Sequence, residues 1–386
     1  MKANQLNKDS NTISWDIKRL GELCVHFKSG FGITSEKIFD TGKYPVYGGN
    51  GLRGYASDFT HEGEFLLIGR QGALCGNIQR ASGKFYVSEH AIAVQTNEKN
   101  DIDFLAYKLD FNNLNRLSES SAQPGLAVEK LVRLKIEIPP LPEQKAIAKL
   151  LSTWDDAITK TEKLIAQKEL QSKWLMQQLL TGKKMLKGFS DKRKKYTYEN
   201  LLKVVKRPVE WNDDELYNLI SVRRRSGGIF FRESLYGHQI KVKDLRNAQV
   251  GDFLFSKMQI VHGASSLVTK EFDGAKISGS YIAVVAKDKS ILNMEFFNWF
   301  SKLKYFYHQT YISSYGVHIE KMTFDFDIFL QLGVTLPSIK EQTAISKVLQ
   351  AAEKEIQLLK TEMEKLREQK KGLMQQLLTG KKRLKL

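Results

Sequence analysis

The feature that most constrains this chain is a segment that occurs twice. The string LMQQLLTGKK begins at Leu175 and again at Leu373, which is 198 positions later. At the same offset, Glu143-Gln144 recurs as Glu341-Gln342, so the duplication extends over roughly 48 residues. Because an internal repeat decides the architecture of a chain, we expect two copies of one structural element with the same beginning and the same end.

Both copies carry apolar side chains at alternating steps of three and four over about five heptads, which is typical of a coiled-coil seam. Gly182 and Gly380 follow the last leucines, where glycine commonly ends a helix. One such helix alone would more often pack on its own domain. Two helices in matched registers favour pairing within the chain, with Trp154 as the large complement of the small Ala352. The expected helix-pairing residues are Ile147, Leu151, Trp154, Ile158, Ile165, Leu175, Leu179, Ile345, Leu349, Ile356, Leu359, Met363, Leu366, Leu373 and Leu377.

The segments before the two helices, 10–138 and 208–336, align with each other weakly. GEFLLI from Gly63 matches GDFLFS from Gly251, and VSEHAIAV from Val87 matches ISGSYIAV from Ile277. Short alternating runs, glycine turns and one or two helices predict an α+β fold for each segment. We therefore expect two diverged homologous domains, with segment boundaries at 1–138, 139–186, 187–336 and 337–386. At their beginnings the alignment sets Trp15, Leu20 and Leu23 against Trp211, Leu216 and Leu219.

The formal net charge of +17 favours nucleic acid as the large partner, since clustered Lys and Arg neutralise phosphates. Ribosome-associated and membrane-surface proteins are basic too. The most basic stretch, 181–210, is either a solvated linker or a phosphate contact, the latter favoured by Tyr196 and Tyr198. Two cysteines without a CxxC motif, and the lack of an apolar leader or spanning segment, predict a reduced cytoplasmic protein.

No pattern of residues in the sequence indicates a catalytic site. There is no phosphate loop, no dinucleotide fingerprint, no HExxH, and no Asn- or Asp-Pro-Pro-aromatic tetrapeptide of amino-methyltransferases. Cys75 has no adjacent histidine, so we expect a buried thiol rather than a nucleophile. The chain is thus expected to be a non-enzyme without a cofactor or metal site of its own.

Candidate DNA contacts lie in glycine-rich loops. The string YGGNGLRGY, Tyr47–Tyr55, is compatible with a hairpin turn and with a loop whose backbone approaches DNA. Within it, Asn50 suits an adenine edge and Arg53 a guanine edge. In the second domain an arginine triplet precedes a glycine turn. The predicted DNA-binding residues are Lys28, Ser29, Asn50, Arg53, Arg70, Gln71, Gln123, Arg223, Arg224, Arg225, Lys257, Ser314 and Tyr315.

The order of variable domain, Pro-x-x-Glu-Gln helix ending in LMQQLLTGKK, second variable domain and second helix resembles the specificity subunits of type I restriction-modification systems over nearly the whole chain. YPVYGGNG and GRQGALCGNI are also similar to the target-recognition domains of that family. The second domain lacks the YGGNG and CGNI strings, so its individual contacts are not carried over from the family.

The resemblance implies that each domain reads one half of a bipartite, asymmetric site in double-stranded DNA. It implies two α+β target-recognition domains joined by two long antiparallel coiled-coil helices in a pseudo-two-fold repeat. These helices would set the spacer and dock two modification subunits. S-adenosylmethionine, ATP and Mg are expected on partner subunits, which methylate adenine and, with restriction subunits, drive cleavage.

A helix from Glu143 to Leu180 would be ~57 Å long at ~1.5 Å per residue. We therefore expect half-sites whose centres lie roughly one DNA turn apart. The alternative from another class is a free-standing coiled-coil DNA-binding regulator or architectural protein, in which helix pairing would produce a homodimer. A single-chain restriction-modification enzyme is opposed by the missing methyltransferase motifs.

Overall fold

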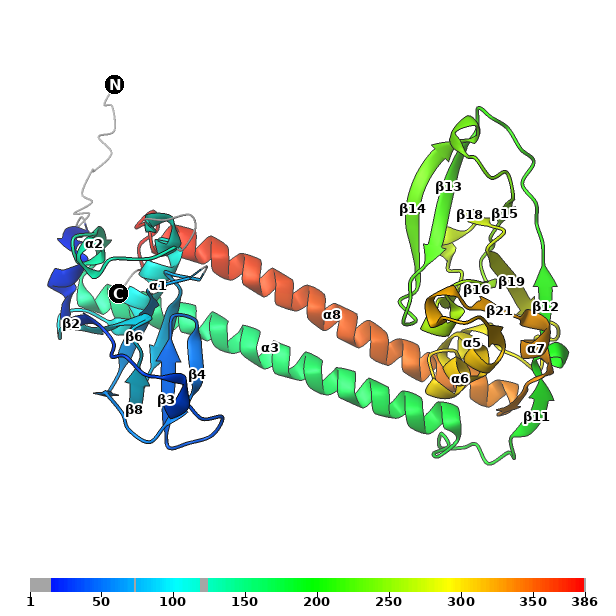
Figure 1. Cartoon of the computed structure of the whole chain (residues 1–386), viewed down its shortest axis with the longest axis horizontal. Coiled ribbons are helices and arrows are strands. Elements are labelled where there is room, and N and C mark those ends of the chain that lie inside the picture. Colours follow the sequence, from blue (N-terminus) through cyan, green and yellow to red (C-terminus); the bar gives the residue numbers. More distant parts are fainter. Residues whose placement is uncertain (1–14, 73, 119–123, 385–386) are drawn as a thin grey trace, which may run out of the picture. The chain divides into compact units, whose positions relative to one another are not determined.

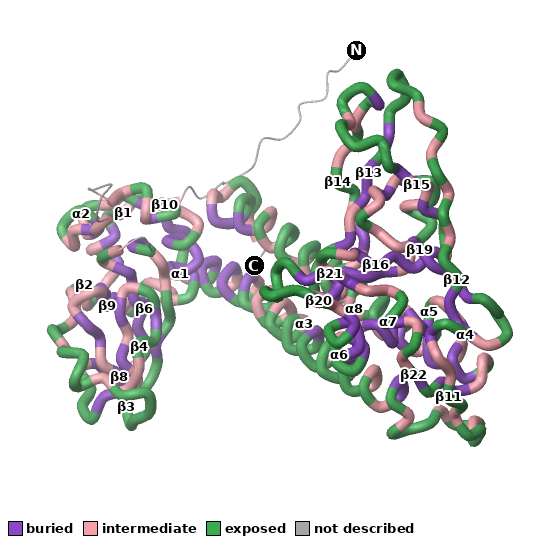
Figure 2. Tube along the Cα trace, turned by 45° about the vertical axis from the view of Figure 1, so that its right-hand side comes forward, coloured by how far each residue is buried: buried purple, intermediate pink, exposed green. Residues whose placement is uncertain are grey.

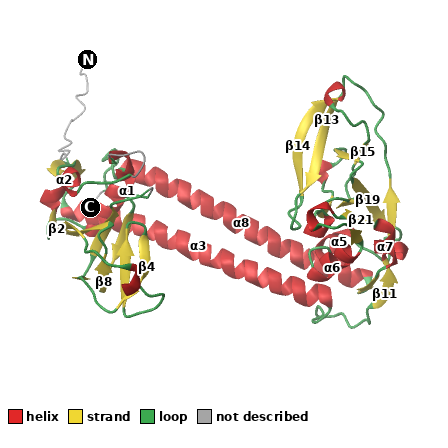
Figure 3. Cartoon of the chain, viewed as in Figure 1, coloured by secondary structure: helices red, strands yellow, loops and turns green. Residues whose placement is uncertain are grey.

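The computed structural model describes residues 15–72, 74–118 and 124–384 (Figure 1). The chain divides into two compact units. Unit 1 comprises Met1–Lys163 and Thr361–Leu386, and unit 2 comprises Leu164–Lys360. Each unit contains one α+β domain and part of two long helices, α3 (Leu141–Thr181) and α8 (Ile339–Leu377) (Figure 3). The units divide the helices between them, whereas the sequence set the helices apart as segments of their own; those four boundaries stay a prediction.

The domain of unit 1 is built on two four-stranded sheets and a short ribbon. The central strand β6 is buried throughout, as its unbroken apolar string FLLIG predicts (Figure 2). The first sheet has the order β2 (Cys24–Ser29), β9 (Ala91–Thr96), β6 (Phe65–Gly69), β7 (Ile78–Ala81). The second has the order β4 (Gly51–Ala56), β3 (Tyr44–Gly48), β8 (Lys84–Val87), β5 (His61–Glu62). The remaining elements are the ribbon β1 (Asp16–Arg19) with β10 (Lys135–Ile138), helices α1 (Ile102–Phe111) and α2 (Val128–Val132), and turns η1 (Leu20–Leu23), η2 (Ser35–Lys37) and η3 (Leu114–Leu117).

Unit 2 repeats the two sheets and the ribbon of unit 1 in the same strand order and adds one further pair of strands. Its first sheet has the order β12 (Leu202–Val205), β19 (Tyr281–Ala286), β16 (Phe253–Ser256), β17 (Ser265–Leu267). Its second has the order β14 (Ile229–Tyr236), β13 (Leu216–Val222), β18 (Lys276–Ser278), β15 (Leu245–Asn247). The ribbon is β11 (Lys194–Thr197) with β22 (Gly333–Leu336), and a second pair joins β20 (Ser314–Tyr315) to β21 (Thr323–Phe324). The helices are α4 (Tyr198–Leu201), α5 (Met294–Phe300), α6 (Lys304–Ile312) and α7 (Phe326–Gln331), with turns η4 (Gly237–Gln239), η5 (Ile260–His262), η6 (Lys270–Phe272) and η7 (Ile319–Lys321). The expected duplication of an α+β fold is confirmed.

The second domain begins earlier than the sequence alignment placed it. Strand β11 starts at Lys194, and the alignment started at 208. Leu216 lies in β13, the counterpart of β3, so its match with Leu20 is wrong; the counterpart of η1 is α4. Tyr198, suggested as a phosphate contact, is fully buried and its hydroxyl donates to Gln309 Oε1 at 2.6 Å. The basic stretch therefore combines the exposed Lys194 and Lys195 of β11 with core residues that follow directly, and it is not a linker throughout.

The Glu-Gln motif joins each domain to its helix. In unit 1, Asp101 N–H donates to Gln144 Oε1 at 2.8 Å, and Gln144 Nε2 donates to Pro139 O at 2.9 Å. In unit 2, the side chain of Gln342 accepts from Asn293 N–H at 2.9 Å and donates to Pro337 O at 2.9 Å. Both glutamines therefore satisfy backbone groups where the chain enters the long helix and where the shorter domain helix begins.

Within each unit the two long helices run antiparallel and are linked by ion pairs. In unit 1 these are Asp155–Lys370 and Glu162–Arg367, with closest N···O distances of 2.5 and 2.6 Å, and Arg383, just after α8, pairs with Glu143 at 2.5 Å. In unit 2 they are Lys168–Glu355 and Glu169–Lys360, at 2.7 and 2.6 Å. The residue number on α8 falls as that on α3 rises, which confirms the antiparallel pairing.

The predicted helix-pairing residues are all buried or half-buried, and those near the helix ends also complete the domain cores. Ile147 and Leu151 belong to the core of unit 1, and Ile345 and Leu349 to the core of unit 2. The proposed complement of Trp154 was wrong. Its neighbour on α3 pairs with Lys370, which places Trp154 level with 371–372 on α8 rather than with residue 352.

Both long helices end as predicted. Gly182 and Gly380 have φ values of 78° and 69°, in the left-handed region where glycine carries no Cβ penalty. The bond that closes each helix is the same: Lys184 N–H donates to Gln178 O at 3.1 Å, and its counterpart in the second copy also measures 3.1 Å. The repeat thus extends to the closing hydrogen bond of each helix.

Candidate nucleic-acid interface

In unit 1 the turn between β3 and β4 packs against the loop between β6 and β7. A Cβ added to Gly69 would lie 2.3 Å from Gly49 O, so glycine permits backbone contact between the two loops. Asn50, predicted as a base contact, is exposed in the first of these turns, and Arg53, the other predicted base contact, is exposed on the strand β4 that follows. The reading of the glycine string as a hairpin turn is confirmed by the pairing of β3 with β4, while the approach of its backbone to DNA stays a prediction.

Arg70 and Gln71 are held in place by their own backbone and by a histidine. Arg70 N–H donates to His90 O at 2.8 Å, and Arg70 O accepts from Leu126 N–H at 2.9 Å. His90 Nδ1 lies 2.7 Å from Gln71 Oε1, and its other ring nitrogen lies 3.2 Å from Glu89 Oε1. The amide of Gln71 is thus oriented in advance, as a group that reads hydrogen-bonding edges requires.

Lys28 and Ser29 lie at the same edge of the domain. Ser29 pairs with Ile92 at the end of β2, and the next residue, Gly30, donates its N–H to Ala91 O at 2.9 Å. The structure therefore places Asn50, Arg70 and Gln71 in neighbouring loops of one domain, and Lys28, Ser29 and Arg53 on its strands β2 and β4. Gln123 lies outside the described residues.

Lys257 in unit 2 occupies the backbone position that Arg70 has in unit 1. Its N–H donates to Ser280 O at 2.9 Å, and its C=O accepts from Phe324 N–H at 2.9 Å. The same two bonds hold Arg70, to the loop before β9 and to the segment after α1. Because the backbone is equivalent and the side chains differ, the two domains present different groups at one position.

The arginine triplet forms a strained turn between β13 and β14. Arg225 and Ser226 adopt φ values of 58° and 53°, a region that costs non-glycine residues roughly 1 kcal/mol or more each. Both backbone N–H groups are secured on the neighbouring loop, to His262 O at 2.7 Å and to Gly263 O at 2.9 Å. The turn is therefore fixed in a shape that displays Arg225.

The three arginines differ in how free their guanidinium groups are. Arg224 is taken up by Gln259 Oε1 at 2.5 Å and by Glu320 Oε2 at 2.8 Å. Arg223 lies over the ring of Phe230 at 4.4 Å. Among the described residues no ion pair engages Arg225, Arg70 or Arg53. Of the triplet, Arg225 is thus the member best placed for a base or phosphate.

Ser314 and Tyr315 form the strand β20, on the side of unit 2 that carries the arginine turn. Ser314 Oγ donates to Thr310 O at 2.7 Å, which turns this hydroxyl inward. Tyr315 is 62 % exposed. Of the two predicted contacts, Tyr315 is therefore the one whose side chain is available to a ligand.

Sequence reasoning missed His90, Gln259 and His262, which support the loops named above. A signal existed for His90: it falls within the matched strings VSEHAIAV and ISGSYIAV, at a position where the two differ. His262 carried no such signal, because its role depends on a contact with Glu320 at 3.4 Å, across 58 positions of sequence.

Other titratable groups of unit 1 are structural. Burial lowers the pKa of both His26 and His61, whose rings lie 5.4 Å apart. Burial raises the pKa of the Cys24 thiol to about 12. Cys75 is 1 % exposed, so the expected buried thiol is confirmed. Within the described ranges no cluster of three or more His, Cys, Asp or Glu side chains could hold a metal ion, and no helix is long and apolar enough to cross a membrane.

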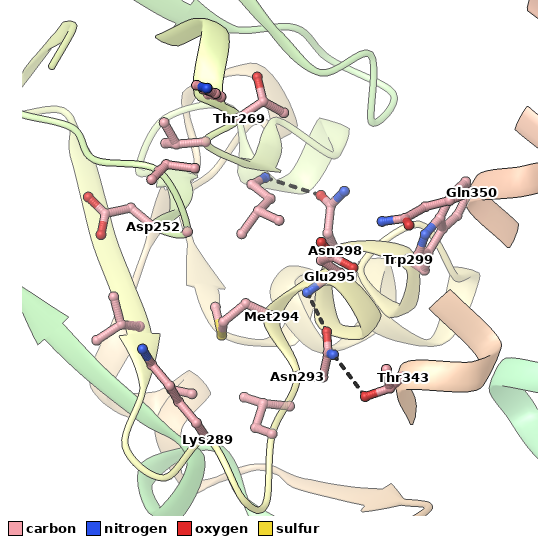
Figure 4. A pocket seen from close by; sticks show the side chains of 18 of the residues that line it. Asp252, Thr269, Lys289, Asn293, Met294, Glu295, Asn298, Trp299, Thr343 and Gln350 are labelled. Carbon is pink, nitrogen blue, oxygen red and sulfur yellow. Dashed lines mark hydrogen bonds between the residues drawn. The ribbon is translucent and has the colours of Figure 1, made fainter. Parts of the chain in front are cut away.

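A cleft of about 910 Å³ lies in unit 2 between β17, α5 and α8 (Figure 4). Polar groups on its walls bond to each other: Leu267 N–H donates to Asn298 Oδ1 at 3.1 Å, and Asn293 Nδ2 donates to Thr343 Oγ1 at 3.2 Å. The corresponding strand and helix of unit 1 are bridged by an ion pair between Arg80 and Asp103 at 2.7 Å. None of the described candidate DNA contacts lines this cleft.

The comparisons with known proteins agree on one family. Residues 13–169 match the family model of the type I restriction modification DNA specificity domain. The type I restriction enzyme EcoprrI specificity subunit of Escherichia coli is 45% identical over 142 residues, which is 36% of this chain and 35% of that protein. This chain thus matches only about a third of the length of that relative. The MjaVIII specificity subunit of Methanocaldococcus jannaschii is 23% identical over 96% of this chain and 93% of its own length.

Solved structures share the fold over almost the whole chain. The crystal structure of the type I restriction-modification S subunit from M. genitalium covers 96% of this chain and 98% of its own, with a TM-score of 0.63 and 15% identity. The HsdS subunit from Thermoanaerobacter tengcongensis covers 95% and 97%, with a TM-score of 0.51 and 15% identity. Residues 13–169 of this chain are thus similar to the DNA specificity domain of type I restriction-modification systems, and the chain shares its fold with the solved specificity subunits over almost its whole length.

Proposed function

We propose that this chain is the DNA-reading subunit of a type I restriction-modification complex, in which each domain reads one half of a bipartite, asymmetric site. The observation that carries the proposal is the equivalence of Arg70 and Lys257. Two domains of one topology hold these side chains with the same two backbone hydrogen bonds, yet surround them with different groups. One scaffold with two sets of reading residues suits a protein that recognises two different short sequences.

The chemistry of the loops supports DNA as the ligand. Arginine and lysine contact phosphates and guanine edges, while amides such as Gln71 and Asn50 contact adenine edges. The net charge of +17 supplies the sequence-independent attraction that brings a duplex to these loops. Arg225, in its fixed left-handed turn, is our assignment for the principal base contact of the second domain.

The docking surface for partner subunits is assigned from exposed side chains that are identical in the two copies of the long helix. Lys173, Gln177 and Lys183 recur as Lys371, Gln375 and Lys381, and all six are exposed. Packing explains why buried residues of the repeat are alike, but it places no demand on exposed ones. We therefore assign one copy of the same partner, a modification subunit, to each helix end.

Catalysis belongs, in this proposal, to the partners. S-adenosylmethionine for adenine methylation, and ATP with Mg for the restriction subunits, are assigned to those chains. The role of this chain is to position the duplex and the modification subunits relative to each other. The long helices are proposed to set the number of unread base pairs between the half-sites.

Mapping adenine methylation across the genome tests the proposal directly. Cells that express the modification subunits are compared with and without this gene. We expect methylation at two short motifs separated by a fixed number of unread base pairs, and its loss when the gene is deleted. Methylation that persists without the gene, or a contiguous motif, would refute the proposal.

The charges of the long helices oppose the alternative of a homodimeric regulator. Glu162 and Glu169 on α3 face Arg367 and Lys360 on α8. Homotypic pairing in the same register would set acid against acid and base against base. Each exposed ion pair contributes only ~0.2–1 kcal/mol. Replacing both attractive pairs by repulsive ones nevertheless disfavours such a dimer. Light scattering of the isolated chain that gives a dimer held by these helices would favour the regulator instead.

A further inference from the structure

Apolar side chains gather on the surface of unit 2 around β20. Tyr311, Ile312, Tyr315, Val317 and Ile319 are 48, 50, 62, 94 and 50 % exposed. Single exposed apolar residues need no explanation, but a run of them within nine positions marks an interaction surface. Figure 2 labels β20 and β21 in this part of unit 2.

The hairpin that carries Val317 is firmly anchored at its base. Phe324 N–H donates to Lys257 O at 2.9 Å, which fixes β21 beside the loop after β16. Gly316 has a φ of 150°, and a Cβ added there would lie 2.9 Å from Met322 Cα, so the two arms of the hairpin cross closely. The backbone of the hairpin thus fixes the position of the exposed Val317.

The same hairpin is tied to the arginine turn. Glu320, three residues after Val317, accepts from Arg224 Nη2 at 2.8 Å and lies 3.4 Å from His262 Nε2. The carbonyl of that histidine accepts from Arg225 N–H at 2.7 Å. Val317 and Arg225 therefore belong to one connected surface, apolar on one side and cationic on the other.

We infer that Val317 contacts the C5 methyl group of a thymine in the second half-site, in the major groove beside the base contacted by Arg225. This inference rests on the proposed function and adds a residue that determines specificity. A phosphate offers nothing to an isopropyl group. Among the base edges of the major groove, thymine alone presents a methyl group, and apolar side chains read it.

The test uses the full chain assembled with its modification subunits, on the target defined by methylation mapping. Each thymine of the second half-site is replaced in turn by deoxyuridine, which lacks only the C5 methyl. We expect one such replacement to weaken binding about fourfold, the value of one buried carbon. The V317S complex should bind the thymine duplex about as weakly, and should not distinguish it from the deoxyuridine duplex.

The control is V242S, an equally conservative change at a valine that is 71 % exposed in the loop between η4 and β15, beyond the opposite end of β13 and β14. It should keep the full thymine preference. The inference is overturned by a second half-site without thymine, by equal binding of all deoxyuridine duplexes, or by a V317S complex that retains the preference. If Val317 instead acted as a wedge in the minor groove, all deoxyuridine duplexes would bind equally. Failure to find any bipartite site would instead overturn the proposed function.

Discussion

Replacing Gln342 with alanine should destabilise unit 2 by about 3 kcal/mol. The side chain is fully buried and makes three hydrogen bonds to backbone groups: it accepts from Asn293 N–H at 2.9 Å and donates to Ile291 O at 2.8 Å and to Pro337 O at 2.9 Å. Each buried group left without a partner costs about 1–3 kcal/mol, and the carbonyl groups lie at the low end of that range. The loss falls on the junction between α5 and α8.

Hydrogen exchange followed by mass spectrometry measures this loss and locates it. A change of about 3 kcal/mol corresponds to roughly a hundredfold faster exchange, which we expect in peptides covering the start of α5. Peptides from the start of α1 should be unchanged in the Gln342→Ala protein, and Gln144→Ala should give the reverse pattern.

Gln350→Ala is the matched control, since this glutamine is exposed on the same helix. It should alter stability by less than about 0.5 kcal/mol. If Gln342→Ala behaves like this control, or if deprotection spreads equally to α1, the role given to the Glu-Gln motif is wrong.

The remaining predictions concern the helices. Inserting about four residues, one turn, into the middle of both long helices should change the number of unread base pairs in the methylated site and leave both half-sites intact. Lys173→Glu and Lys371→Glu should each reduce the number of modification subunits in the complex from two to one, as measured by native mass spectrometry. The double variant should bind none. Burial raises the pKa of the Glu341 carboxyl, with Arg193 opposing the shift, so ionisation costs stability as the pH rises through the unfolded value of about 4.3. In thermal melts, the melting temperature of the Glu341→Gln protein should therefore rise relative to that of the wild type as the pH rises. The Glu143→Gln protein loses the ion pair with Arg383 and should be less stable than the wild type at neutral pH.

The long helices could be predicted from the sequence because their signal is redundant. A heptad pattern, a glycine stop and an exact second copy all specify the same element, and Gly182 shows the φ that its position requires. The pairing register was not accessible in the same way. It depends on which residues of two antiparallel helices lie level, and Trp154 has no local feature that identifies its neighbour.

The start of the second domain was misplaced because charge outweighed periodicity. In β11, Lys194 and Lys195 are exposed, and in α4 Tyr198 is fully buried, so one short stretch combines the features of a linker with those of a core. A domain exchange designed from the sequence alone would have begun at 208 and left β11, α4 and β12 behind. The structure sets the boundary before Lys194.

The candidate interface was predictable at the level of loops but not of side chains. Glycine turns after apolar strands located Arg70, Lys257 and the arginine triplet. The engagement of Arg224 by Glu320 was not predictable, since the two residues are 96 positions apart in sequence and meet only in the folded domain. Availability of a guanidinium group is a tertiary property, and it separates Arg225 from its two neighbours.

The most direct test of the central claim is the exchange of one domain. Residues 194–336 are replaced by the corresponding segment of another specificity subunit, and adenine methylation is mapped in cells that supply the modification subunits. The account predicts that one half of the bipartite motif changes to that of the donor, while the other half and the spacer stay as they were. A change in both halves, or in neither, would contradict the assignment of one domain to each half-site.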